Sequence, residues 1–244
     1  MSIFRPFCIL LILTAALLGK DRLRLEKADV LENKTIDGKT VQYLSLGIIP
    51  IYIFDGKPPP EKRECIQERN KKAKENKEKM DQTNDIVEKQ NFEKGTIRIT
   101  KEYIDDLKHL FNLMGVSYIH ADGEAEAYAS ELCRIGYVDA VVTEDMDTLA
   151  YGCPVLIRNC IDKSIKRPEV ITIFNFNKII EDFKMNHDEF IDMCILCGCD
   201  YCPTIPKVGS IRSLKNIQEY KTIENFLEKN NISVSEEFMK KYIL

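Results

Sequence analysis

The chain has little of what several protein classes require. Its 244 residues include only 11 glycines and 9 prolines, which excludes a collagen-like or linker-dominated protein. Acidic residues outnumber basic ones by 39 to 35, so the net charge of −4 does not favour binding to nucleic acid through overall basicity. Any such partner must therefore meet a local basic patch. The hydrophobic content of 44% suffices for a core, and the length fits one large domain or two small ones.

The chain also lacks the regular cysteine spacing of a small disulfide scaffold. Its nine cysteines are an odd number, which favours a reducing compartment. Four of them form a C-x2-C-x-C-x2-C run, which is compatible with zinc or an iron–sulfur cluster: Cys194, Cys197, Cys199 and Cys202. Because Asp200 lies inside this run and belongs to the acidic set described below, we favour buried small hydrophobic side chains. The three histidines show no ligand spacing.

No hydrophobic run is long enough to cross a membrane. The longest uncharged apolar run extends over twelve residues, from Phe7 to Leu18, whereas a spanning helix needs roughly 20. It resembles the apolar core of a secretory signal, with a small-residue cleavage site at Thr14-Ala15-Ala16. The alternative is a buried helix of the fold.

Short apolar runs alternate along the chain with helical patterns. The β-branched and aromatic run from Ile48 to Phe54 predicts a buried strand that ends just before Asp55. Apolar residues at helical spacing follow Thr100, a capping residue, and Gly115 ends that helix. Further strands are predicted over 116–121, 138–143 and 155–157, and helices over 125–135, 188–197, 210–220 and 223–229, whereas 20–45 is polar and irregular. The alternation predicts an α/β fold with a mainly parallel central sheet and helices on both faces.

Residues 61–93 are highly charged and carry no core-facing apolar stripe. Lysines and arginines outnumber acids as far as Met80, and they include Lys62 and Arg69. Such a segment is most often a solvated helical face; the functional alternative is a mobile basic arm that contacts phosphates.

Six carboxylates lie next to the ends of apolar segments: Asp55, Glu124, Glu126, Asp145, Asp147 and Asp200. Because the carboxyl ends of parallel strands meet at one edge of a sheet, we expect most of them to converge there. Like charges in a dry site need a compensating cation, and all-oxygen ligands favour Mg²⁺ or Mn²⁺. Any single acid here is more simply a solvated loop residue or a helix cap. The whole set favours a two-metal site for phosphodiester displacement.

Four motifs together resemble the flap endonuclease family of XPG-type, structure-specific 5′ nucleases. They are FDGKPP at 54–59, GEAEA at 123–127, TEDMDTL at 143–149 and GCDYCPTIPKVG at 198–209, and the resemblance extends from about Ile48 to Phe226. It implies an enzyme with two Mg²⁺ ions, replaceable by Mn²⁺, that hydrolyses branched DNA near the base of a 5′ flap and has 5′–3′ exonuclease activity. It also implies a role in DNA replication and repair in the nucleus, with the mitochondrion as an alternative and secretion only if residues 1–16 are cleaved.

The resemblance extends to individual residues. The six carboxylates match the family's metal ligands, and Lys62 and Arg69 match a basic pair that stabilises charge on the scissile phosphate. Residues 61–100 match a helical arch through which a single-stranded flap passes. Pro206 to Arg212 and the helix that follows resemble a helix–two-turn–helix element that binds duplex phosphates and a potassium ion. Its predicted DNA-binding residues are Lys207, Gly209, Ser210 and Arg212, and Phe4 matches an aromatic residue that stacks on a base.

The resemblance is incomplete at both ends. The family has a further metal-binding Asp on a strand before FDGKPP, and this chain has no counterpart to it. We therefore expect a missing first strand, a first core helix over Phe7–Leu18, an unpaired edge on Ile48–Phe54 and weak cleavage. No sliding-clamp peptide is expected after the last predicted helix. The regions are then an incomplete nuclease region over 1–60, the arch over 61–100, an internal nuclease region over 101–185 and a DNA-binding region over 186–244. The alternative function is a DNA-junction binder that does not cut.

Overall fold

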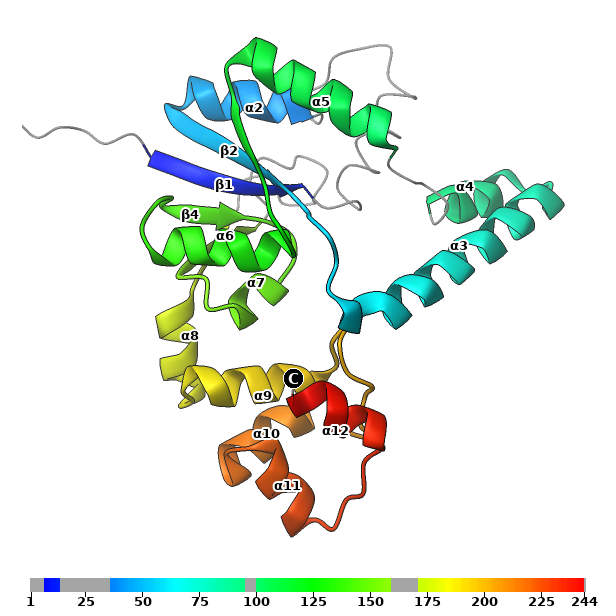
Figure 1. The fold of residues 1–244 in the computed structure, drawn as a ribbon, viewed down its shortest axis with the longest axis vertical. Helices are drawn as coiled ribbons and strands as arrows, with labels where there is room; N and C mark the ends of the chain where they lie inside the picture. The colour runs from blue at the N-terminus through cyan, green and yellow to red at the C-terminus, as the bar shows by residue number, and fades with distance from the viewer. Residues whose placement is uncertain (1–6, 14–35, 95–99, 159–170, 244) are drawn as a thin grey trace, which may run out of the picture.

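A six-stranded sheet forms the centre of the fold in the computed structural model, which describes residues 7–13, 36–94, 100–158 and 171–243 (Figure 1). The strand order is β3-β2-β1-β4-β5-β6. Every neighbouring pair is parallel except β5 and β6. The strands are β1 (Phe7–Leu13), β2 (Ile48–Phe54), β3 (Ser117–His120), β4 (Ala140–Val142), β5 (Val155–Arg158) and β6 (Thr172–Asn175). The predicted mainly parallel α/β sheet is confirmed.

Helices cover both faces of this sheet. On one face, α2 (Ile36–Ser45) and α5 (Lys101–Met114) pack against alternate strand residues such as Leu11 and Tyr52. On the other face, α6 (Ala125–Arg134) covers Leu10 and Ile53, and the short α7 (Asp147–Ala150) packs beside α6. Each layer thus buries one set of alternating side chains, and the strand ends are left open for a site.

The predicted first helix is instead a central strand. β1 lies between β2 and β4, so β2 has a neighbour on each side and the predicted unpaired edge is also wrong. Leu10, Leu11 and Ile12 are 0%, 7% and 2% exposed. A strand buried on both faces is apolar throughout, so its sequence shows no period that separates it from a buried helix. Phe4 and residues 14–18 lie outside the described residues.

The prediction of an irregular segment over 20–45 is wrong for its last ten residues, which form α2. Ile36, Thr40 and Tyr43 lie at helical spacing and are buried, and the Thr40 hydroxyl is hydrogen-bonded to that of Tyr52 over 2.6 Å. The remainder, 20–35, is outside the described residues. The sequence does not show this helix clearly because the polar Thr40 points inward, whereas the apolar Val41 and Leu44 are exposed.

Helix α5 has the ends that its sequence predicts. The Thr100 side chain accepts a hydrogen bond from the Tyr103 amide, and Gly115 ends the helix at φ 67°. Phe111, fully buried, stacks on Tyr52 with ring centroids 4.4 Å apart. This packing fixes α5 against the sheet.

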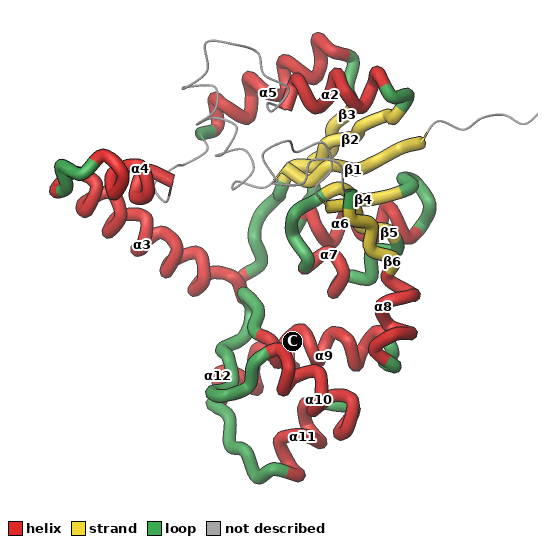
Figure 2. Tube along the Cα trace, turned by 180° about the vertical axis from the view of Figure 1, so that it is seen from behind, coloured by secondary structure: helices red, strands yellow, loops and turns green. Residues whose placement is uncertain are grey.

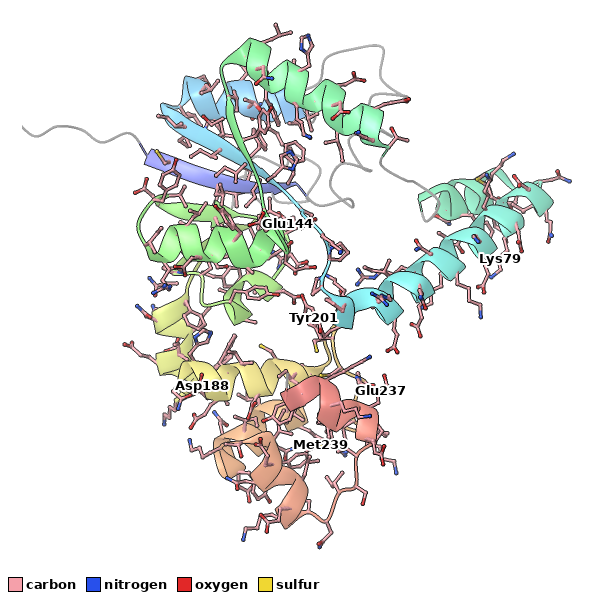
Figure 3. All side chains as sticks on the ribbon, viewed as in Figure 1. Lys79, Glu144, Asp188, Tyr201, Glu237 and Met239 are labelled. Atoms are coloured by element: carbon pink, nitrogen blue, oxygen red, sulfur yellow. The ribbon has the colours of Figure 1, made fainter. Side chains whose placement is uncertain are left out.

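The charged segment after β2 forms a helical hairpin that projects from the molecule (Figures 1 and 2). A 3-10 turn, η1 (Pro60–Lys62), leads into α3 (Arg63–Gln82), and α4 (Ile86–Lys94) returns beside it. Ala73 is the single buried residue of the twenty in α3. Lys79 points into solvent (Figure 3). The exposed charged face that the sequence predicts is therefore observed.

The C-terminal third is a helical layer with its own core. It comprises α8 (Phe176–Phe183), α9 (His187–Cys197), α10 (Ser210–Tyr220), α11 (Ile223–Lys229) and α12 (Glu236–Ile243), and β6, α8 and α12 were not predicted. From α12, Lys241 forms an ion pair with Glu64 near the start of α3. Within the described ranges, the four thiols of the cysteine run do not converge on one point. In the same ranges, no helix is long and apolar enough to span a membrane.

A candidate active site at the carboxyl ends of the strands

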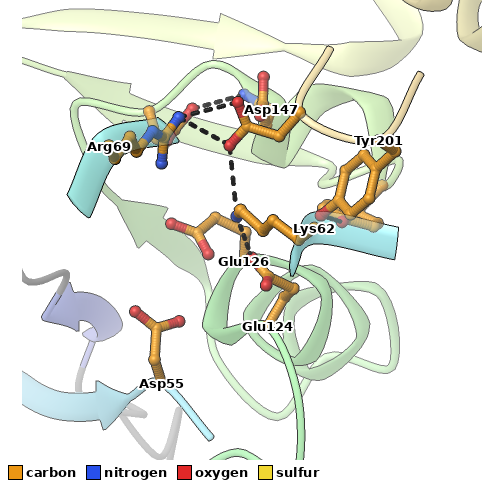
Figure 4. Close-up of a pocket in the computed structure, with 10 residues that line it drawn as sticks. Asp55, Lys62, Arg69, Glu124, Glu126, Asp147 and Tyr201 are labelled. Carbon is orange, nitrogen blue, oxygen red and sulfur yellow. Dashed lines mark hydrogen bonds and ion pairs between the residues drawn. The ribbon is translucent and has the colours of Figure 1, made fainter. Parts of the chain in front are cut away.

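A polar pocket of about 310 Å³ lies where the sheet, the base of α3 and the loop after α9 meet (Figure 4). It is lined by ten residues, which include all six predicted carboxylates and both predicted cations: Asp55, Lys62, Arg69, Glu124, Glu126, Asp145, Asp147, Tyr151, Asp200 and Tyr201. These residues come from segments that are far apart in the sequence. The fold thus brings the predicted constellation together.

The carboxylate side of the pocket is built on strand ends and helix starts. Asp55 directly follows β2, and its carboxylate accepts a hydrogen bond of 3.0 Å from the Ala125 amide at the start of α6. Glu124 is the N-terminal cap of α6, and Glu126 lies in its first turn. A Cβ on Gly56 would lie 2.1 Å from the carbonyl oxygen of Ala121, so the chain after Asp55 passes the end of β3 at a distance that only glycine permits.

Asp145 and Asp147 lie between β4 and α7. The Asp145 amide donates to the Thr143 hydroxyl over 3.1 Å, and the Asp145 carboxylate accepts from the Asp147 amide over 3.0 Å. This local turn holds both carboxylates at the strand end. Asp200 reaches the same pocket from the loop after α9.

Burial and mutual repulsion make three of the carboxylates harder to ionise: Asp55, Glu126 and Asp147. Burial, followed by the charge of Asp55, raises the pKa of Glu126 to about 7. Burial also raises the pKa of Asp55, and burial together with the charge of Asp145 raises that of Asp147. Oxygen atoms of Asp55, Glu124 and Glu126 all lie within 4.8 Å of one another. This donor set of converging, partly desolvated oxygens fits a hard divalent cation, which would remove the repulsion.

Two cations from η1 and the start of α3 face the carboxylates. The Lys62 Nζ lies 2.7 Å from Glu124 Oε2 and 3.6 Å from Asp200 Oδ2. Arg69 donates to both oxygens of Asp200 over 2.8 Å. Burial opposes ionisation of Asp200, but a hydrogen bond from Cys65 and the charges of Arg69 and Lys62 lower its pKa. Likewise, Glu124 raises the pKa of Lys62 against the effect of burial. The lysine and Asp200 are therefore charged at neutral pH.

Sequence analysis did not identify the two tyrosines of the pocket. The hydroxyls of Tyr151 and Tyr201 lie 3.0 Å apart, and the Lys62 ammonium lies 5.7 Å from the centroid of the Tyr201 ring. Cys65, also missed, donates its thiol to Asp200 over 3.3 Å. The position of Tyr201 directly after Asp200 in the GCDYC motif was the available signal.

The predicted DNA-binding residues do not line this pocket but lie at the start of α10. Gly209 is the N-terminal cap of α10, and Ser210 is its first residue. The Arg212 guanidinium donates to the Lys207 carbonyl over 2.7 Å, and Lys207 has a φ of 66°. The Arg212 contact therefore holds the turn before the helix. Phe4 is outside the described residues.

A family model and several curated relatives match this chain. Residues 115–200 match the family model described as the XPG I-region. "Flap endonuclease 1" of Glycine max is 41% identical over 196 residues, covering 79% of this chain and 51% of the relative. "Flap endonuclease 1" of Xiphophorus maculatus is 40% identical over 200 residues, covering 81% and 52%. The chain thus spans about half the length of these curated relatives.

Solved structures share the fold. Flap endonuclease-1 from Methanococcus jannaschii is 26% identical with a TM-score of 0.66, and the match covers 98% of this chain and 78% of that one. The catalytic core of Rad2 in complex with a DNA substrate has a TM-score of 0.70 at 22% identity, and the match covers 93% and 66%.

Proposed function

Because the chain belongs to the XPG-type nuclease family, we propose that it is a structure-specific nuclease that hydrolyses branched DNA near the base of a 5′ flap. The observation that carries this proposal is the pocket, in which six carboxylates face two cations at the base of a helical hairpin. The names of the flap endonuclease relatives support a flap as the substrate. The catalytic-core structure with a DNA substrate supports DNA as the class of polymer.

We propose that the carboxylates hold two Mg²⁺ ions, for which Mn²⁺ would substitute. Asp55, Glu124 and Glu126 offer oxygens close enough together for one ion. The remaining acids of the pocket, Asp145, Asp147 and Asp200, would complete the second position. When bound, such a pair supplies an activated water and stabilises the leaving oxygen.

Lys62 and Arg69 would act on the phosphate itself. Their ion pairs with Glu124 and Asp200 keep both cations at the pocket. From there each can donate to a non-bridging oxygen of the scissile phosphate, where negative charge develops. The exchange of a carboxylate partner for a phosphate oxygen keeps each cation paired throughout.

Two further regions would hold the DNA. The hairpin of α3 and α4 would form the arch that admits the single-stranded flap, since its face is exposed and charged. The turn before α10, with Lys207, Gly209, Ser210 and Arg212, would bind duplex phosphates through its amides and cations, and a K⁺ ion through its oxygen atoms. Phe4 would stack on a base.

We place this activity, together with 5′–3′ exonuclease action, in DNA replication and repair in the nucleus. The mitochondrion is the alternative compartment, and secretion would follow only from cleavage of residues 1–16.

A second candidate function is binding to DNA junctions without cleavage. The observation that favours it is the end of β1. Leu13 is paired with Phe54, and the next residue in the sequence is Thr14, whereas Asp55 follows Phe54. No acid therefore follows β1 directly, where the resemblance to flap endonucleases would require a further metal ligand.

One experiment separates the two functions. The chain is incubated with a 5′-flap duplex, an unbranched duplex and a single strand of the same sequence, in Mg²⁺, Mn²⁺ or EDTA. The nuclease proposal predicts cleavage at the base of the flap in either metal and none in EDTA. Tight flap binding without cleavage in either metal would favour the junction binder, and equal cleavage of all three substrates would contradict structure specificity.

A further inference from the structure

We infer that Tyr151 and Tyr201 form a positioning pair that fixes the Lys62 ammonium at the pocket: the Tyr201 ring holds the ammonium, and the Tyr151 hydroxyl holds the ring. The expected effect of this pair on catalysis rests on the proposed function. The contacts from which we infer the pair do not depend on that function. Figure 4 shows Lys62 between Glu124 and Tyr201.

Lys62 needs such a support because of where it lies. It is the last residue of η1, before a helix that buries only Ala73, so the core does not fix the chain there. A lysine side chain has a flexible four-carbon stem and is a point charge without a planar fork, so ion pairs alone do not fix its direction. The Tyr201 ring, whose centroid lies 5.7 Å from the ammonium, provides a further contact.

The Tyr201 ring is itself held in place by a residue at the end of α7. The Tyr201 hydroxyl is hydrogen-bonded to that of Tyr151 over 3.0 Å, across fifty residues of sequence. Tyr151 ends α7, the helix that starts at Asp147, and Tyr201 directly follows Asp200. The bond therefore ties the loop after α9 to the carboxylate side of the pocket.

The pair also borders a second cavity. This mostly apolar cavity of about 260 Å³ shares Tyr151, Tyr201 and Asp147 with the first. Its walls include Ile191, Ile195 and Cys194. Loss of the Tyr201 ring would remove a wall that both cavities share and give the Lys62 stem room to withdraw.

The inference predicts a graded series of variants. Tyr201→Leu, which removes the ring, is expected to lower the single-turnover cleavage rate at saturating flap DNA by about tenfold. Tyr201→Phe and Tyr151→Phe keep both rings and remove one hydroxyl, so each is expected to lower the rate by about two- to threefold. The dissociation constant for DNA stays unchanged in all three. Tyr128→Leu, which alters an exposed tyrosine on α6, is the matched control.

The decisive comparison is a double-mutant cycle with Lys62→Ala. If the ring acts through Lys62, then Tyr201→Leu has no further effect on the residual rate of the Lys62→Ala variant. If the ring has only a structural role, Tyr201→Leu would lower the cleavage rates of the wild type and of the Lys62→Ala variant by the same factor. That result would overturn the inference.

A second measurement does not depend on cleavage. Each protein is treated briefly with acetic anhydride, and acetylation of Lys62 is quantified by peptide mass spectrometry against Lys74 in the following helix, α3. Lys62 is expected to react at least threefold faster in Tyr201→Leu and near the wild-type rate in Tyr201→Phe and Tyr128→Leu. Unchanged acetylation of Lys62 in Tyr201→Leu would overturn the positioning pair. If Lys62 is acetylated faster in Tyr201→Leu but the wild-type protein does not cut flap DNA, the positioning pair is supported and the proposed function is rejected.

Discussion

The two sides of the pocket are built in different ways. Five of the six carboxylates stand at the ends of β2 and β4 and at the start of α6, where Asp55 and Asp145 accept hydrogen bonds from backbone amides; Glu126 is only 6% exposed. The cations stand on η1 and α3, a helix with one buried residue, and the Arg69 side chain is 60% exposed. Burial raises the pKa of Asp55, Glu126 and Asp147, whereas ion pairs hold the two cations and the Tyr201 ring adds a contact to Lys62. The difference indicates a rigid carboxylate side and a more adjustable cationic side.

The largest effect is expected from the rigid side. Asp145→Ala or Asp147→Ala should abolish flap cleavage and leave DNA binding largely intact, because each removes a carboxylate that the turn after β4 aims into the pocket. Cleavage assays and fluorescence anisotropy with the same flap measure the two properties. Asp182→Ala, an exposed acid on α8, is the control. Full activity in either pocket variant would show that the carboxylates are not metal ligands.

Replacement of either cation of the pocket should lower the cleavage rate more than the affinity for DNA. Lys62→Ala and Arg69→Ala are each expected to lower the rate at saturating DNA by about 10²- to 10³-fold, or roughly 3–4 kcal/mol, because each removes a donor to the transition state. Lys77→Ala on the exposed face of α3 is the matched control. Equal losses of affinity and rate, with no defect at saturation, would make these residues ordinary backbone contacts.

The rigid side also predicts how stability depends on pH without metal. Between the ordinary pKa of 4.5 and its raised value of about 7, Glu126 holds a proton when folded and releases it when unfolded. Stability should therefore fall as pH rises from about 5 to about 8 in EDTA, by up to roughly 3 kcal/mol from this group. Glu126→Gln should flatten the curve measured by thermal unfolding, whereas Glu131→Gln on the solvent side of α6 should not. Parallel curves for wild type and Glu126→Gln would contradict the desolvated site.

The smallest effect is expected on the exposed face of the arch. Replacement of Lys71, Lys74 and Lys77 by Gln should weaken flap binding modestly and reduce its dependence on salt, because each lysine contributes only long-range attraction to phosphates. The melting temperature and the rate at saturating DNA should stay near wild type. An unchanged salt dependence would show that α3 does not face the DNA.

Sequence patterns predicted those parts of the fold that carry strong local signals. β2 follows from a short apolar run before Asp55, and α5 from its periodic core residues between Thr100 and Gly115. The apolar run of β1 does not distinguish a strand from a buried helix, because a strand buried on both faces shows no alternation of polar and apolar residues. The convergence of the carboxylates followed from their places at strand ends.

The contacts within the site could not be predicted from the sequence in the same way. The hydrogen bond between Tyr151 and Tyr201 and the position of Lys62 over the ring depend on how α7, η1 and the loop after α9 pack together. No local period encodes that packing. Sequence reasoning therefore identified the charged residues of the pocket but not the aromatic pair beside them.

Titration with Mn²⁺, followed by electron paramagnetic resonance of the free ion, tests most directly whether this pocket is a divalent metal centre. The account predicts that wild-type protein binds two Mn²⁺ ions and that Mg²⁺ displaces them. It further predicts that the double variant Glu126→Gln, Asp147→Asn loses both, while Glu131→Gln, Asp182→Asn retains them. Equal Mn²⁺ binding by wild type and the pocket variant would contradict the account.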